Sequence, residues 1–363
     1  MSASVQDLET PALLVDLDRL ERNLDRMAAY TAGHGLALRP HVKTHKSPWL
    51  AGQQLRRGAA GLTCATPREA EVMSAAGDNL LLAYPPIGTR KLERLMALPA
   101  PVRLTVALDS AAAVEPLAAA AALHDREVGV YIEVDVGMHR VGVCSTAEAI
   151  ALARLVRARP PLAYAGIAFY PGHIRARGSE QAPLIEQLGA ALAQLLAELD
   201  RTGLAPPVVS GGSTPTAWHA HEIDGLTEVR PGTYVFNDRA TAELGACAWD
   251  DCALTVLATV VSTAVPGQAV VDAGTKALGR EPLPGAPGQG FGVLLDRPEV
   301  TVARMSEEHG ILDLHATVWK PEVGERVRII PNHVCIAVHL ADAVHGVRES
   351  AVETEWPVAA RGR

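Results

Sequence analysis

The sequence predicts an α/β protein: a (β/α)8 TIM-type barrel followed by a mainly antiparallel β domain. From about residue 10 to 240, short apolar runs rich in β-branched residues alternate with helical stretches rich in Ala, Leu, Glu and Arg. Eight or nine such repeats in this span are typical of a closed parallel barrel. After residue 240 the chain carries short β-rich runs with few helical stretches between them, which indicates antiparallel pairing. A doubly wound sheet is the alternative for the first part.

The expected barrel strands, in chain order, are residues 13–17, 37–43, 61–66, 79–85, 102–109, 128–136, 164–170, 207–213 and 228–236. The helix expected before residue 203 ends at Gly203, a residue type favoured just after a helix C-terminus. Another expected helix starts at a capping box of Ser145 and Glu148. The later β runs are ALTVLATVVSTA, QAVVDAG, GVLLD, ILDLHATVW, RVRIIP, CIAVHLAD and VETEWPVAAR. We therefore expect a barrel domain over 10–240 and a β domain that consists of residues 241–363 together with residues 1–9.

Composition limits the classes of function. The chain has 33 basic and 41 acidic residues, a net charge of −8, so a nucleic acid or an acidic membrane is not the expected partner. No apolar run is long enough to span a membrane, and the start has no basic and apolar leader pattern, which favours a cytoplasmic protein. Five scattered cysteines argue against a disulfide framework. A small polar substrate is expected.

Polar residues gather where the expected strands end. In a barrel these ends meet at one face, where the functional site lies. The segments are HVK, CAT, EVDVGMHR, FYPGH, SGGST and RPGTY. Six such placements favour an active site over chance.

The segment RPHVKTHK, 39–46, carries five basic or histidine side chains directly after an apolar run. Lys43 lies among Arg39, His41 and Lys46, and this crowding beside an apolar strand disfavours its charged form. A neutral lysine amine is what Schiff-base chemistry needs. The alternative is that all of these are solvated cations of a loop.

Two glycine turns close the last two expected barrel strands. SGGST, 210–214, and RPGTY, 230–234, combine glycine with hydroxyl side chains. Exposed backbone N–H groups and hydroxyls at such turns can hold a phosphate, and the last strands are its usual place in a barrel.

The opening TPALLVDLDRLERNLDRM, the RPHVKTHK strand and EVDVGMHRVGV resemble the alanine racemase-type pyridoxal phosphate enzymes. Together with SEEHG, PNHVC and the terminal WPVAARG, the resemblance narrows to the branch of D-serine dehydratase and D-threonine aldolase. It extends from about residue 9 to the C-terminus. It implies a homodimer in which the barrel domain binds the cofactor and the β domain carries the metal site.

The resemblance also implies roles for individual residues. Lys43 would hold the cofactor covalently and act as the base that takes the Cα proton. Arg140 would lie near the phenolic oxygen of the cofactor, and Tyr170 with His173 near its ring. The residues implied around the phosphate are Gly212, Ser213, Thr214, Gly232, Thr233 and Tyr234.

A divalent metal is implied beside the cofactor, held here by His333 and Cys335. On a strand, a spacing of two residues would send both side chains to the same face. A thiolate ligand favours zinc, with manganese or magnesium as alternatives. Without the resemblance, a buried cysteine beside a core histidine would be the commoner explanation. Glu308 and His309 are expected near the substrate or in a surface turn.

The expected substrate is a D-3-hydroxy amino acid. Aldolases of this branch carry an aspartate where Cys335 stands and a second histidine where Ala176 stands, whereas D-serine dehydratases carry His-x-Cys with zinc. We therefore expect a D-serine or D-threonine dehydratase, a lyase that eliminates water, with D-threonine aldolase as the alternative and His173 as its base. An amino acid racemase and a non-catalytic pyridoxal phosphate carrier are further alternatives.

Overall fold

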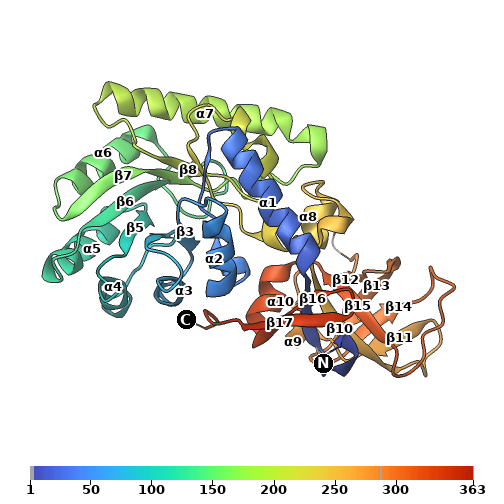
Figure 1. The fold of residues 1–363 in the computed structure, drawn as a ribbon. Helices are drawn as coiled ribbons and strands as arrows, with labels where there is room; N and C mark the ends of the chain where they lie inside the picture. The colour runs from blue at the N-terminus through green and yellow to red at the C-terminus, as the bar shows by residue number, and fades with distance from the viewer. Residues whose placement is uncertain (1–3, 284, 287, 363) are drawn as a thin grey trace. The chain divides into compact units, whose positions relative to one another are not determined.

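The computed structural model describes residues 4–362, apart from 284 and 287 (Figure 1). The chain forms two compact units. The barrel unit contains the described residues among 26–43, 47–232 and 360–363, and the β unit contains those among 1–25, 44–46 and 233–359. The bounds expected for the two domains, 10–240 and 241–363 with 1–9, stay a prediction.

The barrel unit is built on a parallel sheet of eight strands. In sheet order they are β2 (Ala37–Leu38), β9 (Glu228–Val229), β8 (Val209–Gly211), β7 (Leu162–Phe169), β6 (Val128–Val134), β5 (Arg103–Leu108), β4 (Asn79–Leu82) and β3 (Leu62–Cys64). The two edge strands of this sheet, β2 and β3, meet and close it into a barrel. The amide of Ala60 donates to the carbonyl of Leu38, that of Thr63 donates to the carbonyl of Pro40, and His41 and Thr63 form a parallel β-bridge. The predicted (β/α)8 barrel is confirmed.

Helices cover the outside of this sheet (Figure 1). They are α2 (Pro48–Arg56), α3 (Pro67–Met73), α4 (Thr89–Met96), α5 (Ala111–Leu123), α6 (Thr146–Arg157) and α7 (Ala182–Arg201). Each turns a stripe of apolar residues to the strands; in α7 the stripe is Ile185, Leu188, Leu192, Leu195 and Leu199, at the spacing of one helix face. The predicted cap at Ser145 is present, since its side chain accepts from the amide of Glu148.

The β unit contains a nine-stranded sheet, and all of its neighbouring strands are antiparallel except β1 and β16. Its order is β11 (Gln268–Val271), β14 (Gly310–Asp313), β13 (Arg297–Met305), β12 (Gly292–Leu294), β15 (Arg326–Pro331), β10 (Leu254–Ser262), β1 (Ala12–Asp16), β16 (Ala343–Arg348) and β17 (Ala351–Pro357). β11 also pairs with β10, so six of the strands close into a small barrel. The predicted antiparallel domain is confirmed.

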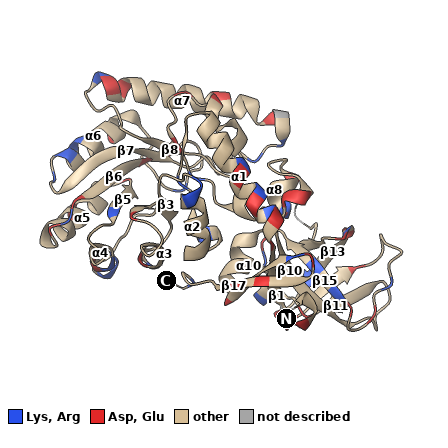
Figure 2. Cartoon of the chain, viewed as in Figure 1, with Lys and Arg blue, Asp and Glu red and all other residues tan. Residues whose placement is uncertain are grey.

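Three short helices and three 3-10 turns complete the β unit: α8 (Arg239–Glu243), α9 (Thr275–Leu278), α10 (Val334–Leu340), η1 (Val5–Asp7), η5 (Thr233–Val235) and η6 (Trp249–Asp251). The remaining helix, α1 (Leu17–Gly33), begins in this unit and continues into the barrel unit. It carries acidic and basic side chains in close succession (Figure 2).

Four expected elements differ from the structure. The strand expected over 228–236 ends at Val229 and is followed by the 3-10 turn η5. The strand expected over 13–17 is not part of the barrel: β1 pairs with β10 and β16 in the β unit, because an apolar strand alone does not specify which sheet it joins. The strand expected over 37–43 ends at Leu38 and is followed by the 3-10 turn η2 (Val42–Thr44). The run CIAVHLAD, expected to be a strand, forms α10, whose buried residues Val334, Ala337 and Val338 have helical spacing.

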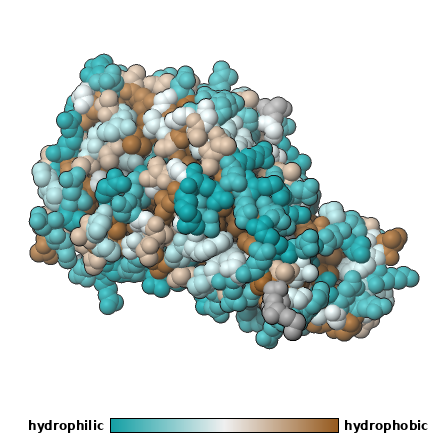
Figure 3. All heavy atoms as spheres, viewed as in Figure 1, coloured by the Kyte–Doolittle hydropathy of each residue, from teal (hydrophilic) through white to brown (hydrophobic). Residues whose placement is uncertain are grey.

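On the face drawn in Figure 3, apolar residues are scattered among hydrophilic ones, as is usual for a protein surface. Among the described residues, no helix combines the length and the hydropathy needed to cross a bilayer.

Candidate active site

The cationic segment after β2 is not a solvated loop. Lys43 lies in the 3-10 turn η2 and is partly exposed, whereas Arg39, His45 and Lys46 are buried. The Nε of Arg39 is 2.7 Å from the carboxylate of Glu228 on β9, and both side chains are at most 7% exposed. The charge of Arg39 is therefore neutralised inside the barrel, and Lys43 is the lysine of this segment that stays accessible.

Three residues predicted to surround the cofactor meet in the barrel unit. Lys43 follows β2, Arg140 lies in the loop after β6, and Tyr170 directly follows β7. The ammonium of Lys43 is 5.9 Å from the centre of the Tyr170 ring, and the guanidinium carbon of Arg140 is 4.7 Å from the same centre. Both separations are within the range of cation–π attraction. The ends of three strands thus bring an amine, a guanidinium and an aromatic ring together.

His173 follows Tyr170 by three residues in the loop after β7 and approaches Gly137, in the loop after β6. A side-chain carbon at Gly137 would come within 3.1 Å of its Nε2, so the glycine makes room for the imidazole. The His173 side chain is exposed and remains accessible to a substrate. Ala176, at the position where aldolases are expected to carry a histidine, only contributes its carbonyl as acceptor for Gln181.

A buried polar network lies among the barrel strands. The carboxylate of Glu228 accepts from Arg39 and, at 2.7 Å, from the hydroxyl of Ser210 on β8. Burial, and then the charge of Glu228, raise the pKa of the nearby Tyr131 to about 12. Burial also raises the pKa of Glu133, although Arg230 and Arg140 oppose the shift. No local pattern indicates the role of Glu228, because its partner Arg39 is 189 residues away.

The turn after β8 has the properties of an anion site. Gly212 has φ of 85°, a conformation that favours glycine. Ser213 and Thr214 are buried beside it, and the Ser213 hydroxyl is 3.0 Å from that of Thr216. Among the described residues, no protein acceptor takes the amide of Gly212 or of Gly232, which leaves two backbone donors for a ligand.

Arg230, the first residue of the second turn, supplies positive charge, and its amide donates to the carbonyl of Gly211. Its Nη2 donates to the carbonyl of Phe169 at 2.7 Å, while its Nε is buried with no hydrogen-bond partner among the described residues. A buried guanidinium N–H without an acceptor is costly unless a ligand satisfies it. These donors fit the phosphorylated, anionic cofactor that the resemblance implies. The other two residues expected at the phosphate, Thr233 and Tyr234, follow Gly232 in the chain and belong to the β unit.

The predicted metal pair lies at the start of α10. His333 is the N-cap residue of the helix and Cys335 is in its first turn, so the pair is not on a strand as expected. The side chains nevertheless interact with each other. The hydroxyl of Thr44, the residue after Lys43 in the chain, is 3.3 Å from the sulfur of Cys335.

Asp238, which sequence analysis missed, orients the histidine. Its Oδ2 accepts from Nδ1 of His333 at 2.8 Å, and its carboxylate is fully buried. Burial alone would lower the pKa of His333, but the charges of Cys335 and Asp238 outweigh it and hold this pKa well above its usual value. The sequence gives one local reason to notice Asp238, which is its position as the N-cap of α8. There its carboxylate accepts from the amide of Thr241 at 2.8 Å.

This arrangement fits a metal ion. With Nδ1 committed to Asp238, the lone pair of His333 is on Nε2, which can share an ion with the thiolate of Cys335. Two protein ligands leave the other positions of the ion open, as a catalytic site requires. The described residues contain no group of three or more His, Cys, Asp and Glu side chains placed to hold a metal.

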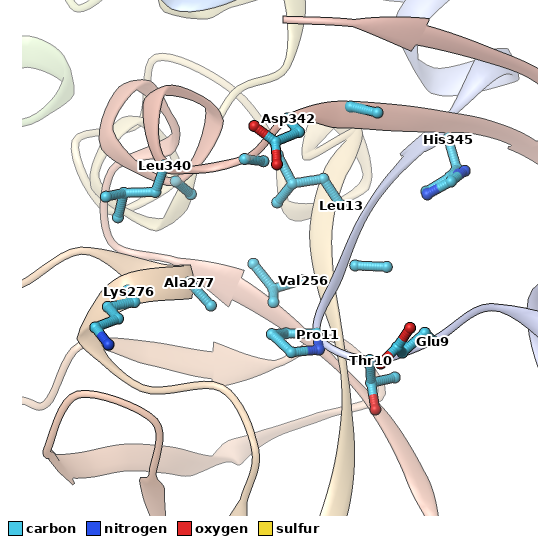
Figure 4. Close-up of a pocket in the computed structure, with 14 residues that line it drawn as sticks. Glu9, Thr10, Pro11, Leu13, Val256, Lys276, Ala277, Leu340, Asp342 and His345 are labelled. Carbon is cyan, nitrogen blue, oxygen red and sulfur yellow. The ribbon is translucent and has the colours of Figure 1, made fainter. Parts of the chain in front are cut away.

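A separate cavity of about 450 Å³ lies in the β unit (Figure 4). Its walls come from β1, β10, α9, α10 and β16 and carry Lys276, Asp342 and His345. His333 and Cys335 do not line it. The Lys276 ammonium is 2.5 Å from the carboxylate of Glu308, and both side chains are exposed, so Glu308 lies in a surface ion pair.

Comparison with known proteins places the chain in a family. Residues 15–240 match the model of the alanine racemase N-terminal domain, and residues 253–347 match that of the putative serine dehydratase domain. The chain belongs to the alanine racemase-like family. Its combination of two domains places it in the branch of D-serine dehydratase and D-threonine aldolase, whose members are pyridoxal phosphate-dependent lyases.

Similar proteins of this alanine racemase-like branch carry both kinds of activity in their names. The D-threo-3-hydroxyaspartate dehydratase of Delftia sp. is 36% identical over 92% of this chain and 93% of its own length. The crystal structure of D-threonine aldolase from Filomicrobium marinum is 34% identical, has a TM-score of 0.92 and covers 100% of this chain and 98% of its own.

A third comparison concerns the metal. A D-threo-3-hydroxyaspartate dehydratase in the metal-free form, with a cysteine replaced by alanine, is 34% identical, with a TM-score of 0.90 over 99% of this chain and 100% of its own. A second solved variant of such a dehydratase has alanine in place of a histidine two positions before that cysteine.

Proposed function

We propose that the chain is a metal-dependent dehydratase that eliminates water from a D-3-hydroxy amino acid, D-serine or D-threonine, to give a 2-oxo acid and ammonia. One observation carries the proposal: the side chain of His333, which Asp238 orients, interacts with that of Cys335, so that the two could share one metal ion. The relatives with dehydratase and aldolase names support the substrate class.

The proposed roles in the barrel unit follow from the contacts of each residue. Pyridoxal phosphate, when bound, supplies an electron sink for the bond that breaks at Cα. The amine of Lys43 would bind the cofactor and then take the Cα proton. Arg140 would donate toward the cofactor's phenolic oxygen, and the Tyr170 ring, which both cations face, would position the cofactor ring.

The phosphate would be bound by the two turns. The unpaired amides of Gly212 and Gly232 and the hydroxyls of Ser213 and Thr214 would donate to its oxygens. Thr233 and Tyr234, which follow Gly232 in the chain, are proposed as further donors.

The metal pair would hold a divalent ion through Nε2 of His333 and the sulfur of Cys335. The thiolate favours zinc over manganese or magnesium. An ion held there would supply a Lewis acid for the β-oxygen of the substrate, whether that oxygen leaves or is deprotonated. The metal-free dehydratase variant that lacks a cysteine supports the role of Cys335.

D-threonine aldolase remains the second candidate, because a named D-threonine aldolase is as similar in fold as the dehydratases. Aldol cleavage needs a base on the substrate hydroxyl, and the exposed His173 is the residue proposed for it. Ala176 cannot supply that base. The dehydratase is therefore preferred.

The test is proton NMR of D-threonine incubated with the protein, pyridoxal phosphate and zinc, with D-serine and D-threo-3-hydroxyaspartate in parallel. A dehydratase gives 2-oxobutyrate and ammonium from D-threonine. Glycine and acetaldehyde would establish the aldolase instead, and then His173→Ala should abolish their release. L-allo-threonine, the product of inversion at Cα alone, would indicate a racemase, and bound cofactor without any turnover would indicate a carrier.

The homodimer implied by the family is also part of the proposal. Light scattering of the holoenzyme tests it directly, since a monomeric mass would contradict it.

A further inference from the structure

Cys247 and Cys252 are in contact, although their C-x4-C spacing predicts no role. They lie in the short segment between α8 and β10, on either side of the 3-10 turn η6. Cys247 packs against a buried cluster of Cys252, Val293 and Ile330. The two thiols also interact through a side-chain hydrogen bond.

The pair is neither a disulfide nor part of a larger metal site. Both sulfurs are free thiols in the structure. Within the described residues no third His, Cys, Asp or Glu completes a group that could hold an ion around them. The remaining chemistry of two adjacent thiols is oxidation.

The two cysteines differ in exposure, so that one can react with an oxidant and the other can then form the disulfide. Cys247 is partly exposed and can meet a small oxidant, whereas Cys252 is 1% exposed. The hydrogen bond to Cys247, and then burial, hold the pKa of the Cys252 thiol well above its usual value. Cys252 therefore keeps its proton and is protected from direct attack, while remaining next to Cys247.

The backbone already brings the two residues together. The amides of Asp251 and Cys252 donate to the carbonyls of Ala248 and Trp249, each at 3.0 Å, and these bonds close the η6 turn. Since the loop between the sulfurs is short and folded back, few conformational changes are needed to join them.

We propose that Cys247 and Cys252 are an oxidisable dithiol, which hydrogen peroxide converts to an intramolecular disulfide. This inference does not depend on the proposed function. The sulfur of Cys247 attacks a peroxide oxygen, the O–O bond breaks, and Cys247 becomes a sulfenic acid as one water is released. The sulfur of Cys252 then attacks that of Cys247, the S–O bond breaks, and the hydroxyl leaves with the Cys252 proton as a second water. The two sulfurs lose two electrons in total, and the peroxide gains them.

The dithiol is also linked to the metal pair by hydrogen bonds. The thiol of Cys247 lies 3.6 Å from the hydroxyl of Thr241, and that hydroxyl and the Thr241 amide both donate to Oδ1 of Asp238 at 2.8 Å. Asp238 in turn accepts from His333. Disulfide formation removes the hydrogen bond that the Cys247 thiol donates to Thr241. We therefore expect oxidation to weaken the binding of the metal at His333 and Cys335. This second part rests on the metal site of the proposed function.

The experiment treats the holoenzyme, loaded with pyridoxal phosphate and zinc, with hydrogen peroxide and then traps the remaining thiols with an alkylating agent. Intact mass and peptide mapping should show the loss of two hydrogen atoms and a cross-linked peptide that joins residues 247 and 252. A reductant should reverse both changes. Cys247→Ser should abolish the cross-link, and Cys252→Ala should leave a sulfenic acid at Cys247 that dimedone traps.

Cys144→Ser is the matched control, because Cys144 is exposed and lies in the barrel unit, and this variant should form the cross-link as the wild type does. Peroxide that oxidises Cys144 while Cys247 and Cys252 stay reduced would overturn the proposal, as would oxidation of Cys247 beyond the sulfenic acid with no cross-link. Zinc release to a chromophoric chelator is measured on the same samples. Faster release from the cross-linked protein supports the link to His333, and an unchanged rate from fully cross-linked protein refutes that link alone.

Discussion

The Nδ1–H group of His333 donates a hydrogen bond of 2.8 Å to Oδ2 of Asp238, a carboxylate with no exposed surface. This bond fixes the tautomer and the orientation of the imidazole before any ion is present. With the imidazole held in this way, His333 and Cys335 at the start of α10 could share the proposed ion.

Asp238→Asn should lower the affinity for zinc by roughly 10- to 100-fold, because an amide group no longer holds His333 in the same tautomer. Helix α8 should persist, since asparagine caps helices about as well as aspartate. Zinc titration against a competing chelator measures the change. Asp250→Asn, at a side chain that is 93% exposed, is the control and should bind zinc as the wild type does. Equal affinities of the two variants would remove Asp238 from the metal site.

Lys43→Ala should abolish the covalent attachment of pyridoxal phosphate, so that borohydride no longer tags the protein with the cofactor. Loss of the proposed base should also lower kcat by on the order of 100- to 10,000-fold. Mass spectrometry after borohydride treatment is the readout. Lys91→Ala is a matched control, because the Lys91 ammonium also faces a tyrosine ring, that of Tyr84, at 5.6 Å. Tagging that survives in Lys43→Ala would assign the cofactor to another lysine.

Glu228→Gln should destabilise the fold by about 3–5 kcal/mol, the usual cost of leaving one charge of a buried pair without its partner. The unpaired charge would be that of Arg39, whose side chain is 7% exposed. Urea unfolding of both variants gives the difference. Glu115→Gln is the control, because Glu115 pairs with Arg159 on the surface, and its loss should leave the unfolding midpoint unchanged. Similar midpoints for wild type and Glu228→Gln would show that the barrel tolerates a lone guanidinium.

Two tyrosines should resist ionisation until about pH 12. Burial raises the pKa values of Tyr131 and Tyr164 to about 12, and the Tyr164 hydroxyl donates to the carbonyl of Leu204 at 3.2 Å. A raised pKa means that the fold favours the neutral phenol, so this stabilisation is complete below pH 10, the ordinary tyrosine value, and is lost as the pH rises toward 12.

The absorbance of tyrosinate, followed during alkaline titration, checks this prediction. Tyr164→Phe should remove one late-ionising group and should make stability fall less steeply between pH 10 and 12. Tyr84→Phe, at a tyrosine that is 51% exposed, should leave the late-ionising groups in place. Ionisation of all tyrosines together at pH 10 in the folded protein would contradict the burial argument.

The barrel was predictable because strands that are neighbours in its sheet are mostly neighbours in the chain. The alternation of apolar strands with amphipathic helices is therefore visible along the sequence. The lysine segment and the two glycine turns are also visible as local patterns, and their roles stay a prediction. The position of β1 was not predictable, because four apolar residues fit the interior of either sheet. Helix α10 was mistaken for a strand because valine and isoleucine favour strands, while burial of one helical face decided the outcome.

The partners of the site residues were the least predictable part. Asp238 meets a histidine 95 positions further along the chain, and Glu228 meets an arginine 189 positions before it. No spacing rule connects such residues, since their contact depends on the closed strand order. The resemblance implies His333 and Cys335 as metal ligands, but only the folded structure shows which carboxylate aligns His333.

The place of β1 between β10 and β16 has a consequence for how the protein is made. The ribosome releases β1 before the barrel strands and its two sheet neighbours, β10 and β16, after them, whereas every neighbouring pair of barrel strands from β3 to β9 is close in sequence. The barrel can therefore form during synthesis, while the N-terminal strand waits, unpaired and apolar, for the end of translation. A chain released from the ribosome after truncation near residue 250 should hold a protease-resistant barrel and an unpaired β1 segment that proteases cut.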